Sequence, residues 1–455
     1  MTLLSTGLKK KIVEIFKLSL PITTSFVAMG IMGIIDTIIV GHYNTEQLAY
    51  IGLANAIFSV LFTIPIGLLQ GVLIKSSQKF GAHKFASCGK IYNEGKRYLM
   101  FLSIFFTFIG INGKTVLTLL GQNEDMVING GAVLTIFSIS IPFILFFVNS
   151  SFFLQSIRRP HIAMYGVVVA NIINIIINPV LVYGLLGFPE LGARGSAIST
   201  LIVRIFLVIY IVLYIRKMEK NPKLNKRFGL SRKYNTWWTD SKTTRQIGYG
   251  VAITTIATNG SYSAVSNFAG WLGEEIMAAF VIFSNVSMIT FMVCFSLSQA
   301  TSIVCANAFG KKNAQIFLQS AKAGGIILTL AIALLCSLIG IFNRELFGIF
   351  TQDEVVINIL SGLIMYLILE IVCDSLPLGI MGPLNGRGDV KIPTILQAIA
   401  FLGVRISACY ILAFEMELGI IGLVIGLSIG GVASLLLNGS RFIYLIRRDI
   451  RKGVY

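Results

Sequence analysis

Three acidic residues, Asp36, Glu370 and Asp374, lie inside long apolar stretches of the sequence. An ionisable side chain within a membrane costs about 3 kcal/mol on insertion scales unless it faces a cavity or a partner, and such residues usually serve a function. A carboxylate in that setting can exchange a proton or bind Na⁺. We therefore predict that the three acids bind a coupling cation. An interhelical ion pair with Arg204 or Arg405 is the structural alternative.

Glu370 and Asp374 are four residues apart, so on one helix their side chains lie on the same face about one turn apart. Two carboxylates in a medium of low dielectric constant repel each other, and we expect them to exchange protons as a coupled pair. The pair could also trade a proton for sodium. This spacing predicts a second ion-coupling site.

Asn171, Asn174 and Asn178 repeat at intervals of three and four residues and form a polar stripe on one face of the helix expected at 161–186. A polar stripe inside a membrane must face protein. The amides could coordinate a cation beside Asp36 or hydrogen-bond its protonated carboxyl. Packing between helices is the second interpretation, and the two are compatible.

The span expected at 247–270 is too polar to face lipid. Its hydroxyl and amide side chains are Thr254, Thr255, Thr258, Asn259, Ser261, Ser263, Ser266 and Asn267. We expect this span to line a cavity. The candidate substrate contacts are Thr258, Asn259, Asn149 and Tyr366, for which helix packing is the alternative.

The composition of the chain indicates that these helices lie in a membrane. The 455 residues are 55% hydrophobic and 13% charged, and the mean hydropathy is +0.82. Apolar stretches of 20 or more residues recur along the chain, each long enough to cross a bilayer core of roughly 30 Å. We predict an all-α membrane protein with spans at 16–40, 50–75, 97–120, 130–155, 161–186, 194–215, 247–270, 277–305, 322–343, 357–384, 392–414 and 419–444.

Charges in the loops test this twelve-span scheme. Most of the 37 Lys and Arg residues fall at the two ends and in the loops on one side, whereas acids dominate the opposite loops. By the positive-inside rule the basic side is cytoplasmic. We expect a multi-pass protein of the cell (inner) membrane with both termini in the cytoplasm. The net charge of +17 therefore reflects membrane topology, and we expect no nucleic-acid partner.

Two halves of the chain carry matching motifs. Glu190-Leu191-Gly192 recurs as Glu417-Leu418-Gly419, and Phe80-Gly81 recurs as Phe309-Gly310 at nearly the same offset. Six spans per half keep the orientation of each half, so the repeats are parallel and pseudo-symmetric. We predict an N-terminal six-helix lobe (1–215), a basic cytoplasmic linker (216–245) and a C-terminal six-helix lobe (246–455), with a cavity between the two bundles.

The motifs also resemble those of the multidrug and toxic compound extrusion (MATE) family. Three pairs of motifs are similar to the family's first helix, its fifth-helix region and its two cytoplasmic turns. They are Gly33-x-x-Asp36 with Gly41-His42; Asn174-x-x-x-Asn178 with Pro189-Glu190-Leu191-Gly192; and Arg158-Arg159-Pro160 with Gly386-Arg387-Gly388-Asp389. By this resemblance Asp36, Asn174 and Asn178 form an N-terminal cation site, and Asp374 belongs to a C-terminal one. Several members carry a glutamate in the seventh span, where this chain has Thr258 or Asn259, and we hypothesise that Glu370 replaces it.

These features predict an antiporter that is coupled to H⁺ or Na⁺ and exports small organic, cationic compounds by alternating access. The alternative is a flippase for a lipid-linked or amphipathic precursor, for which only Arg204 and Arg405 are candidate phosphate ligands. Partners would be the exported compounds and membrane lipids, and a duplicated bundle can work as a monomer. The coupling ion is the only cofactor we expect.

A membrane-embedded enzyme is the alternative to a transporter. A nucleophile, base or metal would have to cluster at one depth, but His42, His83 and His161 lie at span ends or in loops. The sequence also lacks paired-His motifs that could build a zinc site. We therefore expect no enzymatic activity and no metal site other than a possible Na⁺ at the ion-coupling residues.

Overall fold

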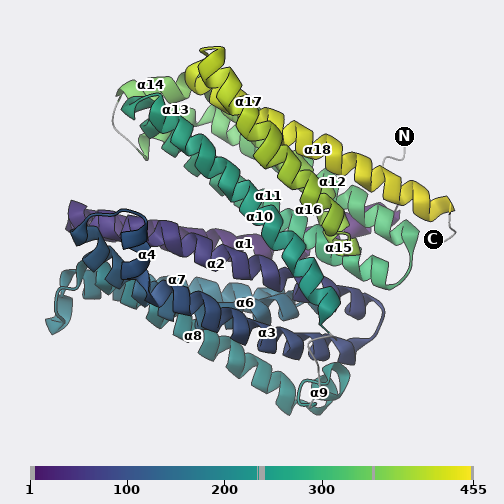
Figure 1. Ribbon diagram of the computed structural model, residues 1–455. Helices are drawn as coiled ribbons and strands as arrows, with labels where there is room; N and C mark the ends of the chain where they lie inside the picture. The colour runs from purple at the N-terminus through teal and green to yellow at the C-terminus, as the bar shows by residue number, and fades with distance from the viewer. Residues whose placement is uncertain (1–5, 233, 235–240, 351–353, 452–455) are drawn as a thin grey trace. The chain divides into compact units, whose positions relative to one another are not determined.

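The structure is a computed structural model that describes residues 6–232, 234, 241–350 and 354–451. Within these ranges the chain is helical and contains no β-strand (Figure 1). Internal contacts divide it into two compact units. Residues 24–248 form one unit, and residues 6–23 join 249–451 in the other. We call them the N-terminal and the C-terminal unit.

The N-terminal unit begins inside the long first helix α1, within three residues of its internal Pro21. Its helices are α1 (Thr6–Tyr43), α2 (Thr45–Gly81), α3 (Phe85–Ile111), α4 (Gly113–Leu119), α5 (Gly131–Ile139), α6 (Ile141–Ser156), α7 (Pro160–Tyr183), α8 (Gly192–Lys220) and α9 (Pro222–Phe228). A short π-helical segment, Met126–Gly130, leads into α5. Helices α2, α3 and α6 pack on one another, and α7 packs along α8.

The C-terminal unit is built around α15, which packs against α11, α12 and α18. Its helices are α10 (Lys242–Trp271), α11 (Glu274–Gly310), α12 (Ala314–Ile341), α13 (Asn343–Gly348), α14 (Glu354–Gly362), α15 (Ile364–Arg387), α16 (Lys391–Ala398), α17 (Ile406–Tyr410) and α18 (Gly419–Arg451). The π-helical segment η3 (Ile399–Arg405) joins α16 to α17, and a second one, η4 (Ile411–Glu415), extends α17, so that all four form one continuous span. Figure 1 shows α18 in yellow alongside α17.

The helices account for the predicted spans. Ten helices of the described chain are long and apolar enough to cross a membrane, and the bent pair α3 and α4 makes an eleventh. Helix α10 has 30 residues, a length of about 45 Å. Its polar residues keep it out of the apolar set, although it is long enough to be the twelfth. The predicted all-α class with about twelve helices in two bundles is confirmed.

Two predicted spans differ in detail. The span expected at 97–120 is broken, because α3 and α4 meet at an angle of 63°. The span expected at 357–384 is divided between α14 and α15.

Local residues fix the ends of two other helices. The Asn44 side chain caps the start of α2 by accepting a hydrogen bond from the Glu46 amide at 2.7 Å. Gly184 ends α7 with a φ of +68°.

Part of the predicted linker 216–245 is helical. Helix α8 continues to Lys220, and α9 follows it immediately, capped by the side chain of Asn221. Residues 233 and 235–240 of the linker lie outside the described residues. The three-part division of the chain into lobes and linker stays a prediction.

Candidate functional site

Asp36 is the centre of a polar cluster in the N-terminal unit. Its carboxylate is 4% exposed on α1. Asn178 of α7 donates to Oδ1 at 2.5 Å, and Thr200 of α8 donates to Oδ2 at 2.9 Å. Asn178 of the predicted asparagine stripe therefore contacts Asp36, and the role of these residues as an ion site stays a prediction.

Two amide oxygens of this cluster have no hydrogen-bond partner. Asn174 and Asn178 are fully buried on α7, and the Oδ1 atoms of both are unpaired. Their amide nitrogens are in use, since Asn174 donates to Ser199 at 3.4 Å and Asn178 to Asp36. A buried acceptor without a donor is costly, so these two oxygens are candidate ligands for a proton donor or a cation. Asn171, the third residue of the stripe, bonds only the Val167 carbonyl of its own helix.

Arg204 lies one helical turn from Thr200 on α8 but makes other contacts. Its guanidinium hydrogen-bonds the Ser140 hydroxyl, and it lies 4.6 Å from the centre of the Phe58 ring. The ring of Phe62 lies 5.8 Å away. This cation–π arrangement holds the charge against α2. No direct ion pair between Arg204 and Asp36 occurs among the described residues.

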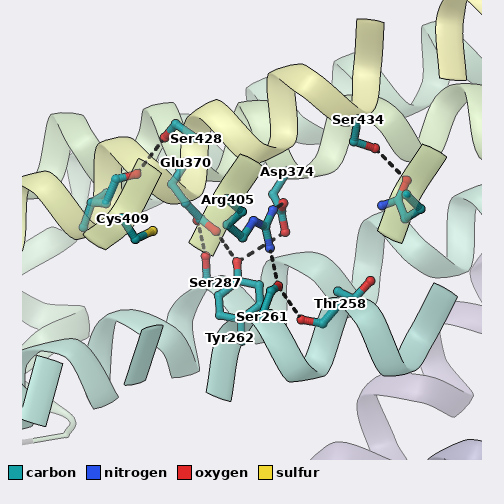
Figure 2. A network of polar contacts seen from close by, with 12 residues as sticks. Thr258, Ser261, Tyr262, Ser287, Glu370, Asp374, Arg405, Cys409, Ser428 and Ser434 are labelled. Atoms are coloured by element: carbon teal, nitrogen blue, oxygen red, sulfur yellow. Dashed lines mark hydrogen bonds and ion pairs between the residues drawn. The ribbon is translucent and has the colours of Figure 1, made fainter. Parts of the chain in front are cut away.

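The second pair of acids lies in a buried network of the C-terminal unit, shown in Figure 2. Glu370 is fully buried on α15, and Asp374 is 7% exposed one turn later. Arg405 of η3, also fully buried, forms an ion pair with Asp374 Oδ1. Asp374 thus makes the ion pair that the sequence offered as the structural alternative.

Hydroxyl groups complete this network. The Tyr262 hydroxyl of α10 hydrogen-bonds Glu370 Oε1 and lies 3.2 Å from Asp374 Oδ2. Ser287 of α11 hydrogen-bonds Glu370 Oε2. Both carboxylates of the predicted pair therefore meet the same tyrosine. Figure 2 shows the acids and Arg405 converging on Tyr262.

Backbone geometry positions Arg405. The guanidinium lies 3.8 Å from the centre of the Phe401 ring, one turn earlier on the π-helical segment, and Nη1 lies 3.4 Å from the Ser261 hydroxyl. Segments of π-helix are frequent at functional sites, because they turn one side chain out of the regular register. Gly430 of α18 permits this packing, since a Cβ there would lie 2.5 Å from the Cβ of Arg405.

The four predicted substrate contacts occupy different environments. Thr258 bonds the Thr254 carbonyl of its own helix at 2.9 Å, and Asn259 is exposed on α10. Asn149 is fully buried on α6 and lies 3.5 Å from the Tyr92 carbonyl of α3, with its own Oδ1 unpaired. Tyr366 is half-buried on α15. Their role in a substrate cavity stays a prediction.

Three residues of these clusters were not predicted from the sequence: Thr200, Tyr262 and Ser287. Each contributes a hydroxyl from a helix distant in sequence from the carboxylate that it contacts. Tyr262 carried the best available signal, because it lies in the span that was already singled out for its polar residues. Among the described residues, no group of three or more His, Cys, Asp or Glu side chains could hold a metal ion.

Comparison with known proteins identifies the architecture. A family model described as MatE matches residues 21–180 and again residues 251–411. Two matches to one model agree with the internal duplication seen in the sequence. A probable multidrug resistance protein NorM of Caulobacter vibrioides is 26% identical over 420 residues, which cover 91% of this chain and 88% of that protein. The probable multidrug resistance protein YoeA of Bacillus subtilis is 24% identical, covering 92% and 90%.

Solved structures share the fold. The eukaryotic MATE transporter AtDTX14 superposes with a TM-score of 0.85 at 19% identity, covering 99% of this chain and 100% of that one. A MOP superfamily transporter from Pyrococcus furiosus gives a TM-score of 0.88 at 18% identity, covering 97% and 98%. The fold and the family match define a multi-pass membrane transporter and not an enzyme. The chain belongs to the MatE family.

Proposed function

We propose that the protein is an antiporter that exports small organic, cationic compounds by alternating access and is driven by H⁺ or Na⁺. The observation that carries this proposal is the Asp36 cluster. A buried carboxylate meets an amide and a hydroxyl donor, while two buried amide oxygens beside them lack donors. An oxygen-lined anionic site of this kind binds a small cation.

The side-chain oxygens of the Asp36 cluster could bind either Na⁺ or a proton. Na⁺ would find hard oxygen ligands in the carboxylate of Asp36 and the unpaired oxygens of Asn174 and Asn178. A proton on Asp36 would turn the carboxyl into a donor, which could supply one of those amide oxygens. In both cases the ion adds one positive charge to the N-terminal unit. Its binding would shift the protein between two states with different substrate affinity.

The relatives of this chain support organic substrates. NorM and YoeA are probable multidrug resistance proteins, and one solved structure of the same fold is that of a multidrug resistance MATE family transporter. The contacts of the two intramembrane arginines favour this reading over a flippase. Arg405 is bound by Asp374 and Arg204 is held by Ser140 and Phe58, so neither offers a free guanidinium to a lipid phosphate.

The C-terminal acids would form a second ion-coupling site within the same function. The seventh span, α10, supplies no acid, but its Tyr262 contacts both Glu370 and Asp374. This contact supports the hypothesis that Glu370 takes the role of the glutamate found in the seventh span of other members. Loss of transport in Asp36→Asn with full retention in Glu370→Gln would reject that hypothesis.

We infer that the protein works in the cell (inner) membrane as a monomer, surrounded by lipid and with both termini in the cytoplasm. Each unit contains its own complete carboxylate cluster. A second copy is therefore not needed to build either site.

Efflux of a fluorescent organic cation from proteoliposomes tests the function. Under imposed proton or sodium gradients, we expect wild-type protein to move the dye and Asp36→Asn to lose gradient-driven transport. Glu124→Gln, which neutralises an exposed acid of the same unit, is the matched control and should transport normally. Absence of dye transport by correctly inserted wild-type protein would contradict the antiporter, and scrambling of a lipid-linked probe would then support the flippase.

A further inference from the structure

The Tyr262 hydroxyl has more acidic partners than it has hydrogens. It hydrogen-bonds Glu370 and lies 3.2 Å from Asp374 Oδ2. A phenol carries one hydrogen and can donate to only one acceptor at a time, while its oxygen can accept from another donor. Two ionised carboxylates cannot donate. If both acids were ionised, the Tyr262 hydroxyl could donate its hydrogen to one carboxylate only. In the other contact its oxygen would lie against a carboxylate oxygen, with no hydrogen between them.

The remaining contacts decide which acid carries the extra proton. Asp374 forms an ion pair with the guanidinium of Arg405, which favours its ionised form. Within the described part of the chain, the hydrogen-bond partners of the Glu370 carboxyl are the hydroxyl groups of Ser287 and Tyr262. A protonated Glu370 satisfies the whole network: Ser287 donates to Glu370 Oε2, Glu370 donates to the Tyr262 oxygen, and Tyr262 donates to Asp374 Oδ2.

We propose that Glu370 holds one proton that is shared through Tyr262 with Asp374, and that this proton, and not Na⁺, is the ion exchanged by the C-terminal unit. The proposal rests on the proposed antiporter and deepens it by naming the ion at one of its two sites. In this state the network is neutral, since Arg405 balances Asp374 and Glu370 is uncharged.

The position of Arg405 argues against a sodium ion at the C-terminal network. A guanidinium is always protonated and already occupies the position beside Asp374 that a bound cation would need. The oxygens of Tyr262 and Ser287 are turned toward carboxyl groups. The C-terminal network therefore differs from the Asp36 cluster, where two amide oxygens stay open.

The surroundings add no competing charge. Among the residues that the structure describes, the titratable groups near Glu370 other than Tyr262, Asp374 and Arg405 are the thiols of Cys336 on α12 and Cys373 on α15. Helix α11 contributes the Ser287 hydroxyl, and α18 contributes Gly430 and Gly431, which touch Arg405 and the Cys373 carbonyl. Release of the proton would leave two carboxylates to share the single guanidinium. That change of partners is the event that could alter the packing of α10 and η3 against α15.

Infrared spectroscopy of the purified full-length protein in lipid tests the assignment without any transport. A protonated carboxyl group gives a carbonyl-stretch band that is separate from the amide and carboxylate bands. We expect this band at neutral pH and its loss in Glu370→Gln, whose amide can donate to Tyr262 and accept from Ser287 and so keeps the hydrogen bonds. Glu345→Gln, an exposed acid of the same unit, should leave the band unchanged. Persistence of the whole band in Glu370→Gln would overturn the proposal.

A second variant covers the case in which Glu370→Gln does not fold. Tyr262→Phe removes the acceptor of the proposed hydrogen bond, and we expect the band to shift while its intensity is kept. An unshifted band would contradict the shared proton.

Sodium is tested in the Asp36→Asn background, which silences the N-terminal site. Addition of NaCl at constant pH should leave the carbonyl band unchanged, whereas its loss would show that Na⁺ displaces the proton and would overturn the proposal. Failure of dye efflux by the wild-type protein with the band intact would reject the antiporter and leave the protonation of Glu370 standing. Dye efflux by the wild-type protein without a Glu370 band would support the antiporter and reject the protonation of Glu370.

Discussion

Asp36 depends on its two neutral donors to remain a usable ion site. The Asn178 amide and the Thr200 hydroxyl contact different oxygens of one carboxylate, from two different helices. These contacts stabilise the ionised form and fix its orientation. Asn174 and Asn178 of the same cluster also carry buried amide oxygens that have no hydrogen-bond partner.

Asn178→Ala tests this arrangement. The variant loses both a donor to Asp36 and an amide oxygen that could bind the ion. A hydrogen bond to a charged group contributes about 1.5–3 kcal/mol, so we expect the ion concentration for half-maximal efflux to rise about tenfold to a hundredfold. Asn171→Ala removes an amide that bonds only its own helix and should change it little. Equal effects of the two variants would indicate a packing role for the stripe.

Arg405 is the residue whose removal should cost the most stability. It is fully buried, and its loss would leave Asp374 without a counter-charge. Breaking a buried pair from one side destabilises by about 3–5 kcal/mol, so Arg405→Met should lower the thermal unfolding temperature in detergent markedly. The double variant Arg405→Met with Asp374→Asn should recover most of the loss, because no unpaired charge remains. A double variant as unstable as the single one would contradict the ion pair.

The sequence identified carboxylates and amides more readily than hydroxyls. Asp36 and Glu370 were conspicuous because acids are rare in apolar spans, and the spacing of Asn174 and Asn178 placed them on one face. Thr200 and Ser287 could not be chosen in this way, since single hydroxyls are common in membrane helices and bond their own backbone. Their partners lie on other helices, and only the packed structure shows which ones.

At the scale of elements, α18 holds the C-terminal network through small residues. A Cβ on Gly430 would meet Arg405 at 2.5 Å, and one on Gly431 would meet the Cys373 carbonyl at 2.5 Å. The internal Pro377 leaves that carbonyl without the amide donor it would have in a regular helix. Helix α18 therefore approaches α15 closely at the turn that carries Asp374.

Gly430→Ala should disturb this approach. The added methyl group must displace Arg405, and overpacking of this kind costs about 1–3 kcal/mol. We expect lower thermal stability and impaired proton-driven efflux. Gly439→Ala on the same helix is the control, because its Cβ would meet only Ile380 Cδ1 at 3.5 Å. A similar loss in both variants would point to a general effect on α18 and not to Arg405.

Apolar stretches predicted the elements well, and the irregular positions less well. All twelve expected spans have a helical counterpart, because a chain in lipid must satisfy its backbone within helices. The 63° bend between α3 and α4 and the π-helical turns around Arg405 were not foreseen. The π-helical segment at Arg405 makes contacts with other helices, such as the ion pair with Asp374 of α15, which no local pattern encodes.

At the scale of the whole molecule, the charge distribution predicts one orientation in the membrane. All six cysteines are buried, so the native chain should give little labelling by a thiol reagent that cannot cross the membrane. Single cysteines replacing Lys9 or Lys312 should react only from the cytoplasmic side. Cysteines replacing Glu124 or Glu345 should react from the opposite side in intact cells. Labelling of Lys9→Cys from outside would contradict the predicted topology.

The internal duplication of the chain places Arg405 at the position that corresponds to Asn178 in the first half. Asn178 and Arg405 are separated by the same number of residues as the two Glu-Leu-Gly motifs, and so are Asn174 and Phe401. Where the first copy has two amides with open oxygens, the second has a phenyl ring with a guanidinium 3.8 Å from its centre. The second copy thus carries its cation as part of the polypeptide, a tethered ligand that never dissociates. Two descendants of one ancestral half would differ in this way: the first keeps amide oxygens that can bind an exchangeable ion, and the second holds a permanent guanidinium beside its exchangeable proton.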